Sequence, residues 1–114
     1  MDEKKIYGLL SLCRKAGKAR SGEQTVLNCI SSGEARLIII ARDASENTSK
    51  RFQDKSAYRG IPVIRFGTME AMGHAMGVSE RAGVAVTDEQ FAGALQERIA
   101  ALQDEEEGVL NGED

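Results

Sequence analysis

Few residues of this chain have the types and spacing that catalysis requires. A hydrolytic or transfer site needs a nucleophile, a base and a group that stabilises charge. The only histidine, His74, has no aspartate at a spacing that would pair with it, and Cys13 and Cys29 lie on apolar helical stripes, where thiols are usually structural. The sequence therefore predicts no catalytic residues and a protein that is not an enzyme. The alternative, a small hydrolase or transferase, would need a pocket that joins His74 or Cys13 to a carboxylate.

Neither a cofactor nor a metal ion is indicated. The two cysteines have no neighbouring Cys or His at metal-ligand spacing, and they are too few for a disulfide framework. The sequence contains no GxxxxGK[ST] or GxGxxG loop for binding nucleotide phosphates. Asp43 and Glu46 follow the most apolar segment, where sites of α/β proteins form, but a turn or capping role is the favoured interpretation of Asp43.

The segment from residue 18 to residue 25 is the strongest candidate for ligand binding. Lys18 and Arg20, on a short extended stretch, lead directly into Ser21-Gly22-Glu23-Gln24-Thr25 at the start of a helix. A helix N-terminus presents unpaired N–H groups and a positive partial charge to phosphate oxygens, and glycine allows a close backbone approach. Glu23 and Gln24 can hydrogen-bond exposed base edges. The pattern is equally well explained by Ser21 as an N-cap beside a solvated basic edge.

Charge is distributed unevenly along the chain. Residues 1–60 hold twelve Lys and Arg against seven acids, whereas residues 61–114 hold three against eleven, six of them after residue 103. The formal net charge of −3 therefore hides a mildly basic body, which permits phosphate binding on one face. With only two Tyr, three Phe and no Trp, the chain lacks the aromatic platform of single-strand binders. A nucleic-acid ligand is therefore expected to be structured RNA.

Size and composition favour one globular domain. The chain has 114 residues, of which 41% are hydrophobic and 29% charged, as is ordinary for a folded domain of this length. Its longest apolar run, Leu37-Ile38-Ile39-Ile40-Ala41, is far shorter than a membrane span, and no secretory segment follows the charged N-terminus. We therefore expect a cytoplasmic protein without membrane contact.

Apolar periodicity predicts that helices and strands alternate. Helices are expected over 3–14, from a cap at Ser21 or Gly22 to Gly33, from caps at Asp43 and Ser45 to about Tyr58, between Thr68 and Gly77, and from a capping box over 87–90 onward. Extended segments or strands are expected at 18–20, 37–41, 61–66 and 83–86.

This order predicts an α/β fold, a three-layer α/β/α sandwich with a central mixed sheet of about four strands. The run over 37–41 is apolar at every position, which indicates a central strand with helices on both faces. Residues 1–103 are expected to form this single domain. Residues 104–114, which begin with an Asp-Glu-Glu-Glu run, are expected to be an acidic, disordered tail.

Five segments, in this order, resemble a known family. They are Ser21-Gly-Glu-Gln-Thr25, the stretch from Gly33 to Ala41 followed by Asp43, Gly60-Ile-Pro-Val63, Met72-Gly-His-Ala-Met-Gly77 and Gly83-Val-Ala-Val86. Together they resemble the kink-turn-binding ribosomal proteins of archaea and eukaryotes, the L-seven-Ae / L-thirty-e superfamily, and most closely its small bacterial ribosomal-protein-like members. The resemblance covers about residues 5–100. It implies the same α/β/α fold and a kink-turn or related internal-loop RNA as ligand.

The resemblance also implies where RNA is contacted. The family's Gly-x-Asn-Glu segment, which reaches the sheared G·A pairs of the kink, falls on residues 21–24, and a second contact loop falls on residues 78–82. Glu23 stands where the family has Asn or Lys, Gln24 where it has Glu, and Leu27 where it has Lys. The predicted RNA-binding residues are Lys18, Arg20, Ser21, Gly22, Glu23, Gln24, Thr25, Val78, Ser79, Glu80 and Arg81.

We therefore expect a monomeric, non-enzymatic protein that recognises structured RNA, with ribosomal RNA among the candidates, and that associates with the ribosome. The alternative is a protein-interaction module on the same fold, which would have a protein partner. Members of the fold exist outside the ribosome, and Glu23 together with the acidic C-terminal segment is consistent with relaxed RNA binding.

Overall fold

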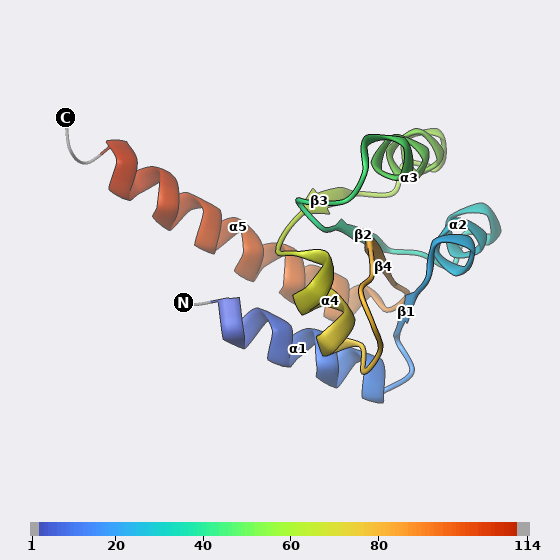
Figure 1. Ribbon diagram of the computed structural model, residues 1–114, viewed down its shortest axis with the longest axis horizontal. Coiled ribbons are helices and arrows are strands. Elements are labelled where there is room, and N and C mark those ends of the chain that lie inside the picture. Colours follow the sequence, from blue (N-terminus) through green and yellow to red (C-terminus); the bar gives the residue numbers. More distant parts are fainter. Residues whose placement is uncertain (1–2, 112–114) are drawn as a thin grey trace.

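Within residues 3–111, which the computed structural model describes, five helices alternate with four strands (Figure 1). The helices are α1 (Glu3–Lys15), α2 (Glu23–Ser32), α3 (Glu46–Arg59), α4 (Met69–Ala75) and α5 (Glu89–Asn111). The strands are β1 (Ala19–Ser21), β2 (Leu37–Ile40), β3 (Val63–Arg65) and β4 (Gly83–Val86). The predicted alternation is confirmed.

The strands form one mixed sheet in the order β1-β4-β2-β3. Strand β4 pairs antiparallel with both of its neighbours, β1 and β2, whereas β2 and β3 are parallel. The last strand of the chain therefore lies inside the sheet, between the first two. This arrangement places the loop that leads into β4 beside the turn that leaves β1.

Helices cover both faces of the sheet, as the uninterrupted apolar run of β2 predicts (Figure 1). Leu37 and Ile39 face a core that includes Ile6 and Leu10 of α1, Met72 of α4, and Leu95 and Ile99 of α5. Ile38 and Ile40 face a second core with α2 and with Phe52 of α3. Successive residues of a strand point to opposite faces, and helices cover both faces here. Every side chain of β2 is therefore fully buried. The predicted three-layer α/β/α sandwich is confirmed.

Helix α5 begins one residue later than the capping-box pattern predicts. Asp88, not Thr87, caps the helix: Asp88 Oδ2 accepts the N–H of Phe91 at 3.0 Å. Thr87 is occupied elsewhere, because its N–H and its hydroxyl both donate to the carbonyl of Lys18, at 2.9 and 3.3 Å. The prediction of Thr87 as the cap is wrong because Thr87 bonds to residue 18, just before β1.

The C-terminal end of α5 lies beyond residue 103, the predicted end of the domain. The helix continues to Asn111, so the expectation of disorder from residue 104 is not met over 104–111, and residues 112–114 lie outside the described part. Gln103 Nε2 donates to the carbonyl of Arg65 at 3.1 Å, and Arg42 lies 4.0 Å from Glu106. Extending an existing helix avoids the cost of nucleation, and Leu, Gln and Glu are good helix formers. The domain boundary at residue 103 stays a prediction.

Neither α5 nor any other helix in the described part combines the length and the apolar character that crossing a lipid bilayer requires.

Replacing Asp88 with Ala removes the side-chain acceptor at the N-terminus of α5. We expect the free energy of unfolding to fall by about 1 kcal/mol, measured by urea denaturation. Asp88→Asn keeps an acceptor oxygen and should retain most of the stability. Equal losses in the two variants would contradict the capping role.

Candidate nucleic-acid interface

The two segments predicted to contact RNA lie side by side in the fold. Ser21 ends β1, and Arg81 lies in the loop between α4 and β4, yet Arg81 Nε donates to Ser21 Oγ at 3.3 Å. Sheet order explains this contact, because Ser21 lies opposite Val84 in the antiparallel pair β1–β4. The residues after β1 and the residues before β4 therefore meet at one edge of the sheet.

Helix α2 begins within the first of these segments, without a side-chain cap. Its N-cap residue is Gly22, with φ 100° and ψ 134°, and no side chain accepts a hydrogen bond from its first turn. The hydroxyl of Ser21 instead accepts from Arg81, so the alternative interpretation of Ser21 as the N-cap is wrong. Because the first N–H groups of an α-helix have no partner within the helix, this end can donate to an external anion.

Helices α3 and α4, unlike α2, have side-chain acceptors for the N–H groups of their first turns. Ser45 Oγ accepts the N–H of Thr48 at 3.2 Å, and Thr68 Oγ1 accepts the N–H of Ala71 at 3.1 Å. Asp43 Oδ1 accepts the N–H of Met69, in the first turn of α4, at 2.8 Å. The prediction that Asp43 caps α3 is wrong, because Ser45 caps that helix and Asp43 instead accepts from the first residue of α4.

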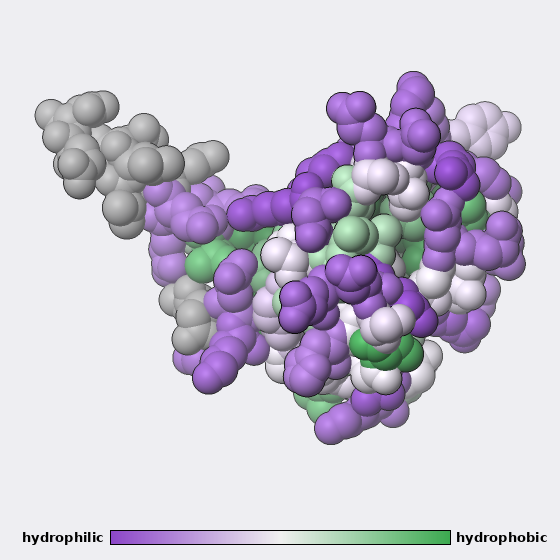
Figure 2. Space-filling model, viewed as in Figure 1, coloured by the Kyte–Doolittle hydropathy of each residue, from purple (hydrophilic) through white to green (hydrophobic). Residues whose placement is uncertain are grey.

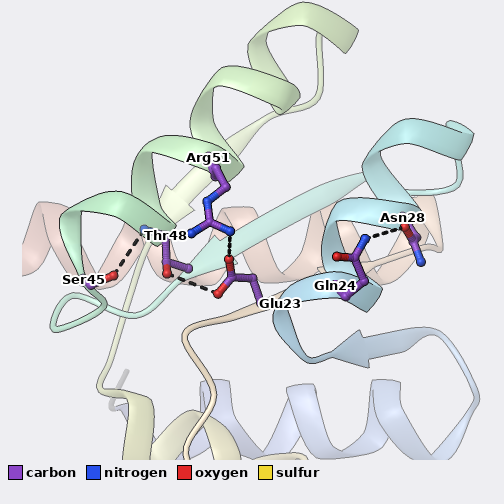
Figure 3. A network of polar contacts seen from close by, with 6 residues as sticks. All are labelled: Glu23, Gln24, Asn28, Ser45, Thr48 and Arg51. Carbon is purple, nitrogen blue, oxygen red and sulfur yellow. Dashed lines mark hydrogen bonds and ion pairs between the residues drawn. The ribbon is translucent and has the colours of Figure 1, made fainter.

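The carboxylate of Glu23 is turned toward α3 (Figure 3). Its Oε1 accepts from the hydroxyl of Thr48 at 3.3 Å, and its Oε2 forms an ion pair with Arg51. The Glu23 side chain is 38% exposed, so the pair lies at the surface, next to the open end of α2. Arg51 therefore offsets the negative charge that Glu23 places there.

Sequence reasoning missed Thr48 and Arg51. Arg51 is 28 positions from Glu23, and no spacing along the chain indicates their contact. The contact arises because α2 and α3 cover the same face of the sheet, where Leu27 is buried in their shared core. Leu27 therefore presents no polar group to this surface, and the nearby cation comes from the neighbouring helix.

The remaining residues of the first segment divide into two groups. Arg20 is exposed, Thr25 is exposed in the first turn of α2, and exposed Gln24 donates from Nε2 to Asn28 Oδ1 at 3.0 Å (Figure 3). Lys18 is also exposed but lies before β1, at the end where its carbonyl accepts from Thr87. The structure therefore brings residues 21–25 together with Arg81, whereas Lys18 lies at the other end of β1 and Arg20 is exposed between them.

A close approach to Gly73 positions the second segment. A Cβ atom on Gly73 would lie 1.9 Å from the carbonyl oxygen of Ser79, so only glycine fits here without movement of the loop. The N–H of Val78 donates to the Gly73 carbonyl at 2.9 Å, and the N–H of Arg81 donates to that of Met69 at 3.0 Å. Helix α4 therefore holds the loop in the position that places Arg81 against Ser21.

Three side chains of this loop are exposed, and Arg81 is fixed by hydrogen bonds within the loop and to Ser21. Val78, Ser79 and Glu80 are exposed. The Arg81 guanidinium also donates to Ser79 Oγ at 3.3 Å and to the Glu80 carbonyl at 2.9 Å. Arg81 is therefore held by three acceptors and is a preformed cationic group at the edge of the interface.

The side chains considered for catalysis differ in exposure: both thiols are buried, whereas His74 lies at the surface near two carboxylates. Burial raises the pKa of the Cys13 thiol to about 11 and also raises the pKa of Cys29, so both remain protonated at neutral pH. His74 is exposed and lines a groove of about 850 Å³ between α1 and α4, with Glu70 and Glu80. No group of three or more His, Cys, Asp or Glu within the described residues could hold a metal ion.

Replacing Gly73 with Ala forces a methyl group against the Ser79 carbonyl. We expect the free energy of unfolding to fall by about 1–3 kcal/mol and hydrogen exchange at the Val78 N–H to accelerate, as measured by denaturation and NMR. Gly93→Ala in α5 is the control, because nothing lies within 4 Å of a Cβ there and helical alanine is the better residue. Similar behaviour of the two variants would contradict the role assigned to Gly73.

Most of the chain matches known proteins. Residues 4–96 match the model of the ribosomal protein L7Ae/L30e/S12e/Gadd45 family. RNA-binding protein YlxQ of Bacillus subtilis (strain 168) is 37% identical over 89 residues, which cover 78% of this chain and 89% of that protein. RNA-binding protein YlxQ of Enterococcus faecium is 31% identical over 98 residues, which cover 86% and 94%. A solved structure of a protein of unknown function from Bacillus halodurans C has a TM-score of 0.79 at 34% identity and covers 90% of this chain and 99% of that one.

Proposed function

The chain belongs to the ribosomal protein L7Ae/L30e/S12e/Gadd45 family, and we propose that it is a non-enzymatic RNA-binding protein whose ligand is a kink-turn or a related internal loop. One observation carries this proposal: Arg81 bonds to Ser21 beside the uncapped start of α2, which joins both expected contact segments into one surface. Two relatives that match most of the chain are named RNA-binding proteins, which supports the same function.

Each part of this surface has a distinct role in the proposed complex. The free N–H groups at the start of α2 donate to phosphate oxygens, and Gly22 allows the backbone to approach them. Arg81 lies beside this end and Arg20 precedes Ser21 in β1, and both supply positive charge that neutralises further phosphates. Exposed Gln24 can exchange its bond to Asn28 for a base edge. Recognition is then by backbone shape and by base edges, as suits a structured RNA.

Glu23 is compatible with this role because of its partner. An unpaired carboxylate at the start of α2 would repel the RNA backbone. The ion pair with Arg51 and the bond from Thr48 hold the carboxylate toward α3. We propose that the Glu23–Arg51 pair takes the place of the neutral or basic residue that the family has at position 23.

We further propose that the RNA is ribosomal and that the protein acts in the cytoplasm, in association with the ribosome. The family is described as one of ribosomal proteins, and the matched residues 4–96 include the whole proposed interface. Ribosome binding can be tested by sedimentation of the protein with purified ribosomal subunits.

The direct test is titration of the protein into a labelled kink-turn RNA and an unbent duplex, at two salt concentrations. We expect the kink-turn to bind selectively, and Arg20→Ala and Arg81→Ala each to weaken it and to reduce the salt slope by about 1. Lys18→Ala is the control, because it removes the same charge from the far end of β1. Equal binding of both RNAs, or an equal effect of all three variants, would reject the proposed site.

A second test concerns the charge of Glu23. Arg51→Gln leaves the carboxylate without its cation and should weaken kink-turn binding, whereas Glu23→Gln frees Arg51 and should strengthen it. Each effect is expected to be a few-fold, since the pair is surface-exposed and screened by salt. Lys50→Gln, on the same helix but paired with Asp54, is the matched control. If Arg51→Gln and Lys50→Gln have the same effect on the dissociation constant, the pair has no special role.

A further inference from the structure

A second hollow lies outside the interface, between α2 and α3. It has a volume of about 320 Å³ and is lined by Ile30, Ser31, Asp54, Lys55, Tyr58 and Arg59. Tyr58 is 89% exposed, more than any other large hydrophobic side chain in the described part of the chain. Tyr58 therefore presents an open aromatic face beside the hollow, on which a planar ligand can stack.

The surface around Tyr58 is hydrophilic and carries positive charge. Hydrophilic side chains cover the face of α3 that is visible in Figure 2. Lys55 Nζ donates to Ser31 Oγ at 3.2 Å, which holds its ammonium group across the seam between α2 and α3, and Arg59 is exposed one turn further on. Asp54, the acid of the hollow, lies 3.5 Å from Lys50, so its charge is offset. The hollow therefore favours an anionic ligand.

The hollow lies along the same seam between α2 and α3 as the Glu23–Arg51 pair of the proposed RNA interface. Arg51, Lys55 and Arg59 are spaced at four-residue intervals along α3, and at 1.5 Å per residue they form a row of about 12 Å. Arg51 contacts Glu23 at the start of α2, and Lys55 contacts Ser31 near its end. A nucleic-acid strand that leaves the α2 N-terminus along this seam would meet Tyr58 within two helical turns.

We propose that this hollow binds one unpaired nucleotide of a single strand that flanks the structured RNA. The base stacks on the ring of Tyr58, and the adjoining phosphates contact Lys55 and Arg59. This inference rests on the proposed function for the position of the strand but uses different residues. Stacking on an aromatic ring needs no particular base, and cations beside it bind the backbone. One tyrosine suffices for one nucleotide, although the chain has no aromatic platform for a long single strand.

The test compares a blunt kink-turn hairpin with the same hairpin carrying four unpaired adenosines on its 5′ or its 3′ strand, measured by fluorescence anisotropy. We expect one of the two extensions to tighten binding by at least about fivefold. Tyr58→Ala should abolish this gain and Tyr58→Phe should keep it, while binding of the blunt hairpin stays unchanged in both. Leu12→Ala, which removes an exposed apolar side chain from α1, is the control.

The outcomes separate this inference from the proposed function. Failure of the blunt hairpin to bind rejects the kink-turn interface alone. The hollow is tested independently by titrating free oligoadenylate into the Tyr7→Phe variant, in which Tyr58 is the only tyrosine and no tryptophan is present. Saturable quenching of its fluorescence, weakened by the change of Lys55 and Arg59 to Ala, is the expected result. The inference would be overturned if neither extension tightened binding, if the gain survived Tyr58→Ala, or if oligoadenylate did not quench the fluorescence. A protein partner would then be the alternative ligand of the hollow.

Discussion

The position of β4 between β1 and β2 is the constraint on which the rest of the structure depends. Its antiparallel pairing with both neighbours buries all four of its residues and closes the centre of the sheet. The same pairing brings the loop before β4 to the turn after β1, where Arg81 meets Ser21. The strand pairing that completes the core also assembles the candidate interface. When β4 pairs with β1 in this register, the loop before β4 is brought to the residues after β1.

The helix ends at this part of the molecule are not equivalent, and the difference matters for binding. Ser45, Thr68 and Asp43 provide acceptors to α3 and α4, whereas α2 begins at a glycine without one. Satisfied N–H groups stabilise a helix but do not bind ligands. The open end of α2 therefore leaves backbone donors available, and Arg51 of α3 and Arg81 of the 78–82 loop contact the residues beside it.

Charge at this surface is set by contacts between helices. The sequence places an acid at position 23, in the first turn of α2, and a leucine one turn later. Packing of α2 against α3 buries Leu27 and places Arg51 against Glu23, which offsets the negative charge of the acid. The same seam continues to Lys55 and Tyr58, so one helix pair shapes both the interface and the neighbouring hollow.

The sequence by itself determined the fold class and the family, and its resemblance to that family indicated the two segments expected to contact RNA. These depend on local patterns: the all-apolar run of β2 required helices on both sheet faces, and the ordered motifs were specific enough to identify the family, which the family match confirms. Helix caps and ends were less predictable, as Thr87 and the continuation of α5 past residue 103 show, because a donor or an acceptor can be taken by a distant strand or loop. Only the tertiary structure decided the partners of Glu23, the separation of Lys18 and the hollow beside Tyr58. Such contacts join residues tens of positions apart, and no periodicity along the chain encodes which side chains two packed helices bring together.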